Sequence, residues 1–151
     1  MPYLDSQIPP PAHQRGNGVA ELVFAARGPG SGLAHLFHSD PCRVLFPRAE
    51  IGHPPTAVLL TISGGLTGGD RLRLNITARD GAAATVTSGA AEKIYRSLGP
   101  DTSIDIRIGV ERAWLEFLPQ ETILFEGSRL RRNTEVDLSA GARFLGCEML
   151  V

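Results

Sequence analysis

Alternation of apolar and polar residues is the clearest pattern in this chain. It is strict over residues 72–76, returns over residues 104–110, and appears again around residues 136–138. A period of two turns one side chain toward the core and the next toward solvent, which is typical of a half-buried β-strand. Residues 19–27 and 56–62 are predicted as two further strands, and the continuous apolar run of the second indicates a buried one.

A faint internal repeat connects these strands. Three segments each read as a strand, a tight turn, an alanine and a second strand: residues 75–87, 107–119 and 135–148. Their alanines, Ala82, Ala113 and Ala142, recur at intervals of roughly 30 residues. Such a period in a strand-rich chain predicts stacked β-layers, each burying its face on the next. The predicted fold is therefore mainly all-β, in a β-helix-like or solenoid-like stack with few short helices.

The ends of the chain differ from this middle part. Residues 1–18 are rich in proline and glycine and are expected to be a disordered arm, which leaves residues 19–151 as the β domain. Residues 33–47 are expected to be irregular, because their prolines would interrupt a helix. Residues 144–151 resemble a strand still in progress, so we expect the chain to be the N-terminal part of a longer β protein.

The composition limits the class of function. With a net charge of −1 and 21 % charged residues, the chain lacks the basic excess of a nucleic-acid-binding protein. It shows no signal-peptide pattern and no apolar run long enough to span a bilayer. Cys42 and Cys147 lie far apart and form no spaced pair, which favours a reducing cytoplasm.

Candidate catalytic and metal sites are few. His35, His38 and Cys42 have ligand-like spacing, but the prolines and the loop around them favour an accidental cluster. The glycine-rich residues 63–70 form no Walker A loop, since no Gly-Lys-Ser/Thr follows, and no dinucleotide fingerprint. A nucleophilic triad is not visible, because no histidine follows His53. Two interpretations of the glycine loop stay open: a turn between strands, or a flat patch that admits a partner's backbone.

Three motifs occur in a fixed order along the chain. They are Ser-Gly-Gly-Leu-Thr-Gly-Gly-Asp-Arg-Leu at residues 63–72, Ala-Ala-Glu-Lys-Ile-Tyr-Arg-Ser at 90–97 and Leu-Pro-Gln-Glu-Thr-Ile-Leu-Phe at 118–125. Together they resemble the urease accessory protein UreD family, called UreH in some organisms. Residues 129–132 and 145–148 continue the resemblance, which begins near residue 33 and leaves out the proline-rich arm. Proteins of this family are much longer, so the resemblance implies that roughly a C-terminal half is missing here.

The resemblance implies a scaffold and not an enzyme. Proteins of this family bind the urease apoprotein and recruit a helical accessory protein, UreF, and a GTPase, UreG. The assembly inserts nickel into urease, with nickel in transit through an internal tunnel and no tightly bound cofactor. The candidate nickel-transit carboxylates within the motifs are Asp70, Glu92, Glu121 and Glu148. The candidate partner-binding residues are Gly64, Gly65, Gly68, Gly69, Lys93, Tyr95, Arg96, Gln120, Arg129, Arg131 and Arg132.

Two other classes of function stay open beside this one. The chain could be a non-catalytic β-solenoid interaction domain, or a small hydrolase or nucleotide-using enzyme with the glycine loop at its site. The enzyme hypothesis needs a base or nucleophile that the sequence does not offer. The absence of a closed Cys/His motif agrees with a conduit, because a metal bound by oxygen ligands and water is easier to release.

Overall fold

The computed structural model describes residues 14–49 and 51–151, which form strands joined by turns and loops. The strands are β1 (Asn17–Arg27), β2 (Gly30–Ser39), β3 (Cys42–Leu45), β4 (Thr56–Thr61), β5 (Arg71–Arg79), β6 (Ala83–Ser88), β7 (Glu92–Ile94), β8 (Thr102–Glu111), β9 (Trp114–Leu118), β10 (Thr122–Leu124), β11 (Leu130–Leu138) and β12 (Arg143–Gly146). Residues 1–13 of the expected arm lie outside the described residues. Asn17 and Gly18, its last two residues, belong to β1.

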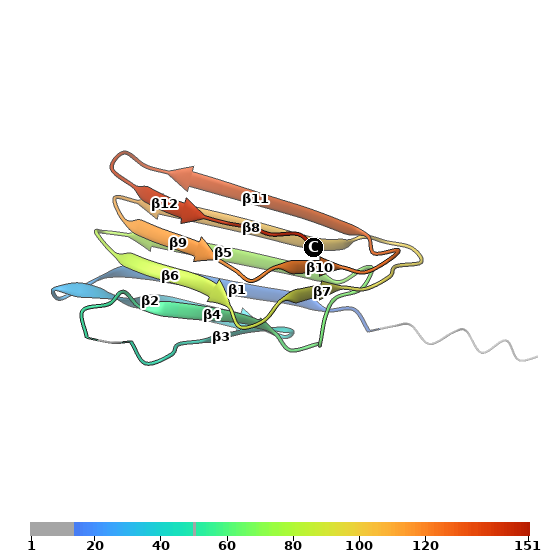
Figure 1. Cartoon of the computed structure of the whole chain (residues 1–151). Helices are drawn as coiled ribbons and strands as arrows, with labels where there is room; N and C mark the ends of the chain where they lie inside the picture. The colour runs from blue at the N-terminus through green and yellow to red at the C-terminus, as the bar shows by residue number, and fades with distance from the viewer. Residues whose placement is uncertain (1–13, 50) are drawn as a thin grey trace, which may run out of the picture.

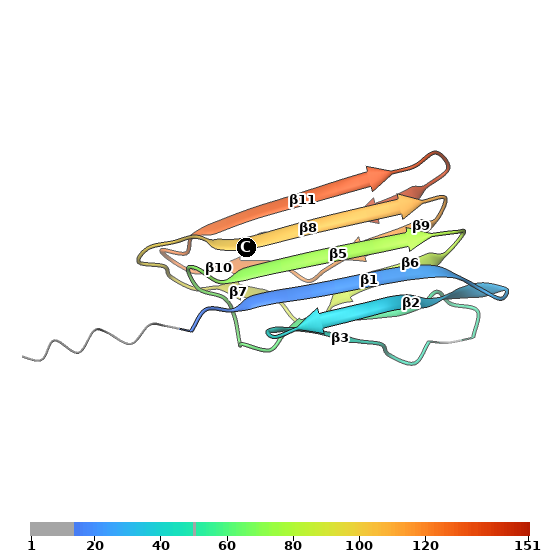
Figure 2. The ribbon, with the colours of Figure 1, turned by 180° about the vertical axis from the view of Figure 1, so that it is seen from behind.

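The strands form two five-stranded sheets and one two-stranded sheet (Figure 1). The first sheet has the order β11-β8-β5-β1-β2 and the second the order β12-β9-β6-β4-β3, while β10 and β7 form the small sheet. The two large sheets lie face to face, with the first sheet in front in Figure 2. Their inward side chains make one hydrophobic core, in which Phe24, Leu115 and Phe117 are almost fully buried.

The chain passes repeatedly through these sheets. It runs from β5 to β6 and β7, then from β8 to β9 and β10, and finally from β11 to β12. Equivalent strands of successive passes pair in parallel, so that Ala83 lies opposite Trp114, and Trp114 opposite Arg143. Passes of nearly equal length keep this register, which is the physical basis of the sequence repeat.

The repeated alanines lie in the tight turns between the two large sheets. The Trp114 N–H donates to the Ala82 carbonyl (2.8 Å), and the Arg143 N–H donates to the Ala113 carbonyl (2.9 Å). Gly81 turns the chain with a φ of 80°, a conformation that glycine adopts without a steric penalty. Ala82 and Ala113 are buried in these turns, and Ala142 packs against the core.

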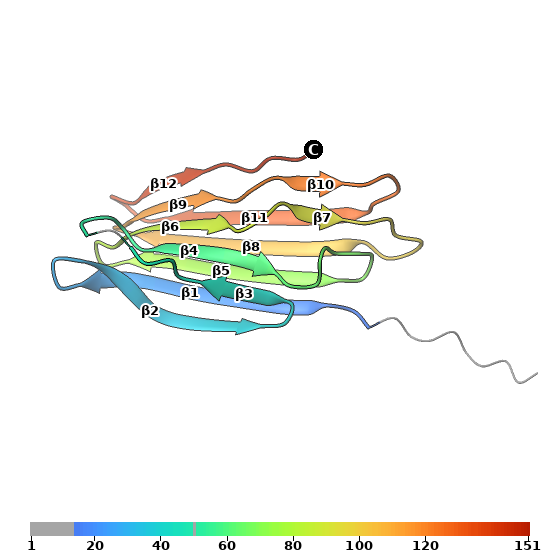
Figure 3. The ribbon, with the colours of Figure 1, turned by 60° about the horizontal axis from the view of Figure 1, so that its bottom comes forward.

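Residues 33–47, predicted to be irregular, lie largely in β2 and β3, so that prediction is wrong. Proline argued against a helix there, but Pro41 lies in the short connection between the two strands and interrupts neither. The structure pairs β2 with β1 and β3 with β4, both antiparallel. Figure 3 shows β2 and β3 close together on the side away from β12, and the strand orders place them at the sheet edges opposite β11 and β12.

The prediction of an all-β chain is confirmed, but the few short helices are absent from the described residues. The tight turns between the large sheets are too short for a helix. The longer connections from β6 to β8 and from β9 to β11 contain the short strands β7 and β10. Within residues 14–49 and 51–151, there is accordingly no helix capable of crossing a membrane.

Gly68, in the loop before β5, tests how tightly these connections stack. A Cβ atom at Gly68 would overlap the Ser97 hydroxyl oxygen and the Pro100 carbonyl oxygen, and the φ of Gly68 is not in the left-handed region. We expect Gly68→Ala to lower the free energy of unfolding by about 1–3 kcal/mol, because the overlap forces the two loops apart. Urea unfolding followed by circular dichroism measures this change.

The matched control is Gly99→Ala. A Cβ at Gly99 would meet nothing within 4 Å, and this φ also lies outside the left-handed region. The control should change the free energy of unfolding by less than about 0.5 kcal/mol. Equal effects of the two substitutions would contradict the stacking of residues 68 and 97–100.

Candidate functional site

A cavity of about 230 Å³ lies between the sheets, beside the small sheet of β7 and β10. Its first-sheet wall and the facing wall are mainly apolar, and they include Leu59, Leu72, Leu74, Ile104, Ile106 and Phe117. Polar side chains also belong to the lining: Arg43, Thr61, Ser88, Glu92, Lys93, Gln120, Thr122 and Arg132. The cavity is therefore a mainly apolar space whose lining includes one acidic residue and three basic ones.

Glu92 is the carboxylate in this cavity. The Thr61 hydroxyl donates a hydrogen bond of 2.5 Å to Glu92 Oε2. Burial raises the pKa of Glu92 above its ordinary value, while the Thr61 hydroxyl, the Lys93 backbone and the Arg132 charge act in the opposite direction. A carboxyl group held this way keeps its proton to a higher pH than a solvated one does.

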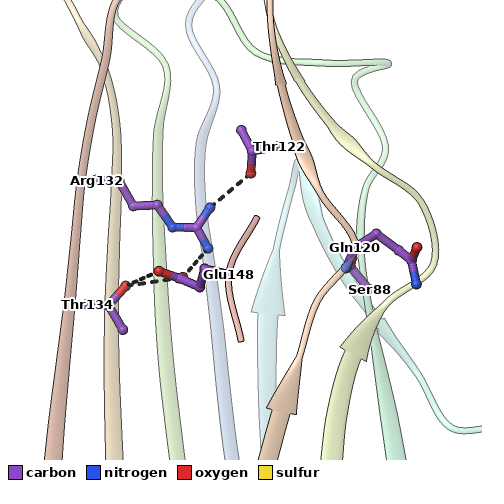
Figure 4. Close-up of polar contacts among 6 residues, drawn as sticks. All are labelled: Ser88, Gln120, Thr122, Arg132, Thr134 and Glu148. Atoms are coloured by element: carbon purple, nitrogen blue, oxygen red, sulfur yellow. Dashed lines mark hydrogen bonds and ion pairs between the residues drawn. The ribbon is translucent and has the colours of Figure 1, made fainter. Parts of the chain in front are cut away.

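Arg132, on β11, joins two further residues to the cavity (Figure 4). Its Nη1 donates to Thr122 Oγ1 at 3.1 Å, and its Nη2 donates to Glu148 Oε1 at 2.5 Å. The Thr134 hydroxyl lies 3.3 Å from both carboxylate oxygens of Glu148. The Arg132 side chain is 17 % exposed and that of Glu148 is 34 % exposed, so the arginine end of this ion pair is largely buried and the carboxylate end stays partly in contact with water.

Successive passes of the chain stack these groups above one another. Thr122 lies opposite Glu92 in the parallel pairing of β10 with β7, and Glu92 accepts from Thr61 of the preceding pass. Arg132 then links Thr122 to Glu148 of the last pass. We call Thr61, Glu92, Thr122, Arg132 and Glu148 the internal polar group.

Asp70 and Glu121 are not part of this group. The Asp70 carboxylate accepts from the Gly16 N–H (2.7 Å) and from the Thr67 N–H (2.8 Å), which ties the glycine loop to the start of β1. The Glu121 carbonyl accepts from the Glu92 N–H (2.9 Å), but Glu121 does not line the cavity. Of the four candidate carboxylates, the structure thus brings Glu92 and Glu148 together through Arg132 and leaves the other two outside.

Comparison with known proteins assigns the chain to a family. The family model of the UreD urease accessory protein matches residues 16–151. The chain belongs to the UreD family. The match takes in all twelve strands of the described residues, and with them the cavity and the internal polar group.

Individual UreD proteins show the same relationship. The chain is 47 % identical over 135 residues to "Urease accessory protein UreD" of Magnetococcus marinus, which covers 89 % of this chain and 47 % of that protein. It is 51 % identical over 110 residues to the UreD of Granulibacter bethesdensis (72 % and 45 % covered) and 42 % identical over 142 residues to that of Brucella suis (91 % and 50 % covered). The chain spans about half the length of the curated UreD proteins that it matches.

The glycine pairs of the first UreD motif have a role inside the chain. Gly64 and Gly69 have φ values of 74° and 91°, which disfavour other residues. A Cβ at Gly65 would lie 2.5 Å from the Tyr95 ring, and one at Gly68 would overlap Ser97. The next pass of the chain therefore packs on this loop, while contact of the glycines with a partner stays a prediction.

Most of the other candidate partner residues lie on the surface. Tyr95 and Phe125 stack with ring centroids 5.1 Å apart and are 41 % and 44 % exposed. Arg129 binds Asp101 at 2.8 Å. Lys93, Arg96, Gln120 and Arg131 are also exposed. Arg132 differs from these residues, because its side chain faces the interior and lines the cavity.

His35, His38 and Cys42 each have contacts other than those of a shared metal site. His35 lies 3.5 Å from Glu21, and the His38 ring Nδ1 lies 3.2 Å from the Cys42 carbonyl oxygen. Burial, with a smaller contribution from Glu92, raises the pKa of the Cys42 thiol to about 11, so it stays protonated at neutral pH. In the described parts of the chain, no three His, Cys, Asp or Glu side chains are grouped to hold a metal ion.

Sequence analysis missed the inward position of Arg132. Alternation contains the signal, because Arg132 has the same parity as Val136 and Leu138, which mark the core face of the predicted strand. Thr61 and Thr122 were missed as well, since a single threonine at the end of a short strand carries no recognisable pattern.

Glu92→Gln tests the buried state of this carboxyl group through pH. Because the folded state has the higher pKa, Glu92 contributes stability below the ordinary glutamate pKa of 4.5, and this contribution is lost as pH rises through the folded pKa. We expect the free energy of unfolding of the variant, relative to wild type, to increase as the pH rises through that range. Urea unfolding at a pH below 4.5 and at neutral pH measures both proteins.

Glu126→Gln removes one negative charge from an exposed loop residue and serves as the control. A relative change with pH of the same size in both variants would show that net charge, and not the burial of Glu92, is the cause.

Proposed function

We propose that this chain is a urease accessory protein that takes part in inserting nickel into urease and has no catalytic site of its own. The match of residues 16–151 to the UreD family carries the proposal. The chain acts as a scaffold in the cytoplasm that binds the urease apoprotein together with a UreF-like helical protein and a UreG-like GTPase. Nickel is cargo in this role and not a resident cofactor.

The cavity supports a route for nickel through the protein. It offers carboxylate and hydroxyl oxygens at Glu92, Thr61 and Thr122 inside apolar walls. Oxygen ligands hold a borderline cation such as Ni²⁺ less tightly than a set of thiolates and imidazoles does. Weak ligands permit release.

The parallel passes support a β-helix-like arrangement for the fold. Equivalent strands lie one pass apart in both large sheets and in the small one. In such a stack, each pass adds inward side chains above those of the previous pass. A route along the stacking axis then follows the internal polar group from Thr61 toward Glu148.

The enzyme hypothesis receives no comparable support from the glycine loop. The packing of Tyr95 and Ser97 against Gly65 and Gly68 fills the space where a substrate would need to approach the backbone. The Asp70 carboxylate has two backbone donors in the same loop and is 7 % exposed, so it is not available as a base. The plain interaction-domain hypothesis differs from the proposal in requiring no binding of the urease apoprotein, so co-purification with that apoprotein separates the two.

Urease activity in cells tests the proposal. Cells that carry a urease operon without its UreD gene should regain activity when this chain is supplied, because the UreD role would be restored. The full-length UreD of Magnetococcus marinus serves as the positive control. If the relative restores activity and a soluble, accumulating chain does not, residues 1–151 alone lack the proposed function.

Glu92→Gln separates a nickel route from a plain scaffold. We expect the variant to restore about tenfold less activity than wild type at limiting nickel, since the charged cavity ligand is lost. Glu126→Gln, on an exposed loop, should restore as much activity as wild type. Full activity of Glu92→Gln would favour a scaffold that needs no route through the cavity.

A further inference from the structure

We propose that β11 is a self-complementary edge strand, which pairs antiparallel with β11 of a second copy of this chain and places Thr134 of both copies on a twofold axis. This inference is independent of the proposed function. Among the described residues, β11 pairs only with β8, so one of its two edges is open. An open edge of this length presents a row of backbone groups on which another strand can pair.

The backbone of β11 determines which residues can pair across this edge. The Thr102 N–H donates to the Arg129 carbonyl just before β11. The Ser139 N–H donates to the Val110 carbonyl just after it. Odd-numbered residues of this segment therefore direct their N–H and carbonyl groups toward β8. Because the direction alternates along a strand, the even-numbered residues within 130–138 direct theirs outward, and they can form hydrogen-bonded pairs with the same residues of a second copy.

An antiparallel register centred on Thr134 uses the whole strand. It places Thr134 opposite Thr134 and Leu130 opposite Leu138 of the other copy, so every outward N–H and carbonyl of β11 gains a partner. In the same register, Arg131 lies opposite Asp137 of the other copy, and the twofold axis repeats this pair. Opposite charges at directly paired positions stabilise antiparallel strands. The sequence of β11 thus complements itself in both backbone and charge.

The two charges in this pair are available for the contact. Arg131 and Asp137 are exposed, and within the part of the chain that the structure describes neither forms an ion pair. Glu135 differs from Asp137, because it already binds Arg107 of β8 at 3.4 Å. The register centred on Asn133 would pair Arg131 with Glu135, and it would compete with this existing contact. The free charges therefore favour the register centred on Thr134.

The second sheet ends on the same side of the molecule, along β12 and residues 147–151 (Figure 1). The Thr134 hydroxyl lies 3.3 Å from both carboxylate oxygens of Glu148, which places Glu148 across from the centre of β11. A twofold axis through Thr134 and perpendicular to the first sheet therefore passes close to Glu148, so both sheets can continue into the second copy. Leu145 and Leu150, on either side of Glu148 in the chain, are 51 % and 61 % exposed. Association along this side would cover apolar surface in addition to pairing the backbone.

A strand from a different protein is the alternative occupant of this edge. Such a strand would use the same outward backbone groups, but it would not require Arg131 and Asp137 to complement each other within one sequence. A second copy accounts for that complementarity, because a twofold axis brings each of the two residues to the other in both directions. The oligomeric state of the purified chain separates these two occupants.

Sedimentation equilibrium of the purified chain tests the proposal. We expect wild type to form dimers in the micromolar range. Arg131→Asp should weaken the dimer at least about tenfold, because it places two carboxylates opposite each other at both symmetric positions. Arg27→Asp is the matched control, since it makes the same charge change at an exposed arginine of β1 in the same sheet. Its dissociation constant should stay within about twofold of wild type, as expected for a screened surface charge.

Exchange of the two charges tests the register. The double variant Arg131→Asp/Asp137→Arg should restore the dissociation constant to within about threefold of wild type, because it recreates both opposite-charge pairs. In the register centred on Asn133, the exchanged residues would instead meet like charges at Glu135 and Arg129, and the dimer would not be restored. Circular dichroism verifies that the variants are folded.

Cross-linking through Cys147 tests the position of the axis without changing β11. Cys147 is exposed and precedes Glu148, whereas Cys42 is buried. A bismaleimide with a short spacer should therefore join two wild-type chains. Cys147→Ser should abolish the covalent dimer and leave the dimer seen in sedimentation unchanged. The cross-link carries the test if a charge variant of β11 does not fold.

A wild-type chain that stays monomeric at high micromolar concentration would overturn the inference. It would also be overturned if Arg27→Asp weakened the dimer as much as Arg131→Asp, or if the folded double variant did not regain dimerisation. None of these results bears on the proposed function, which fails by a different one, the inability of the wild-type chain to restore urease activity in cells.

Discussion

Parallel pairing between equivalent strands of successive passes is the constraint on which the rest of this structure depends. It fixes which side chains lie above one another, because a strand one pass later repeats both the register and the inward face of the strand before it. The pairing requires passes of similar length and turns of small volume. Alanine at the repeated turns and the close packing of Gly65 and Gly68 on the next loop are consequences of the same stacking.

Stacking also explains how polar groups come together in an otherwise apolar interior. Glu92 is separated from Thr61 and from Arg132 by long stretches of sequence, yet the register places all three around one cavity. Each group interacts mainly with the pass before or after it. A polar side chain that faces inward is therefore paired with one at the equivalent position of the neighbouring pass. A row of polar groups can thus cross the interior without leaving the two sheets unpaired.

Features that depend on the periodicity of the sequence were predicted. Features that depend on which residues of successive passes lie side by side were missed. The strands around Leu72 and Ile106 and the repeat of the turn alanines follow from a period of two and from the interval between passes. The strands β2 and β3 were missed, since Pro41 suggested an irregular segment where it only marks a turn. Among the candidate carboxylates, the motifs gave no means of separating Glu92, which lines the cavity, from Asp70, which holds a loop.

The interior of this chain is difficult to explain by stability alone. Burial raises the pKa of Glu92, which means that ionising it inside the protein is unfavourable. A partly buried ion pair such as Arg132–Glu148 contributes little net stability compared with apolar side chains of similar volume. A mainly structural core would have aliphatic residues in place of Glu92 and Arg132, as it has at Leu72 and Ile104. Charged groups beside the cavity therefore have a cost in stability that the packing of the apolar core does not require.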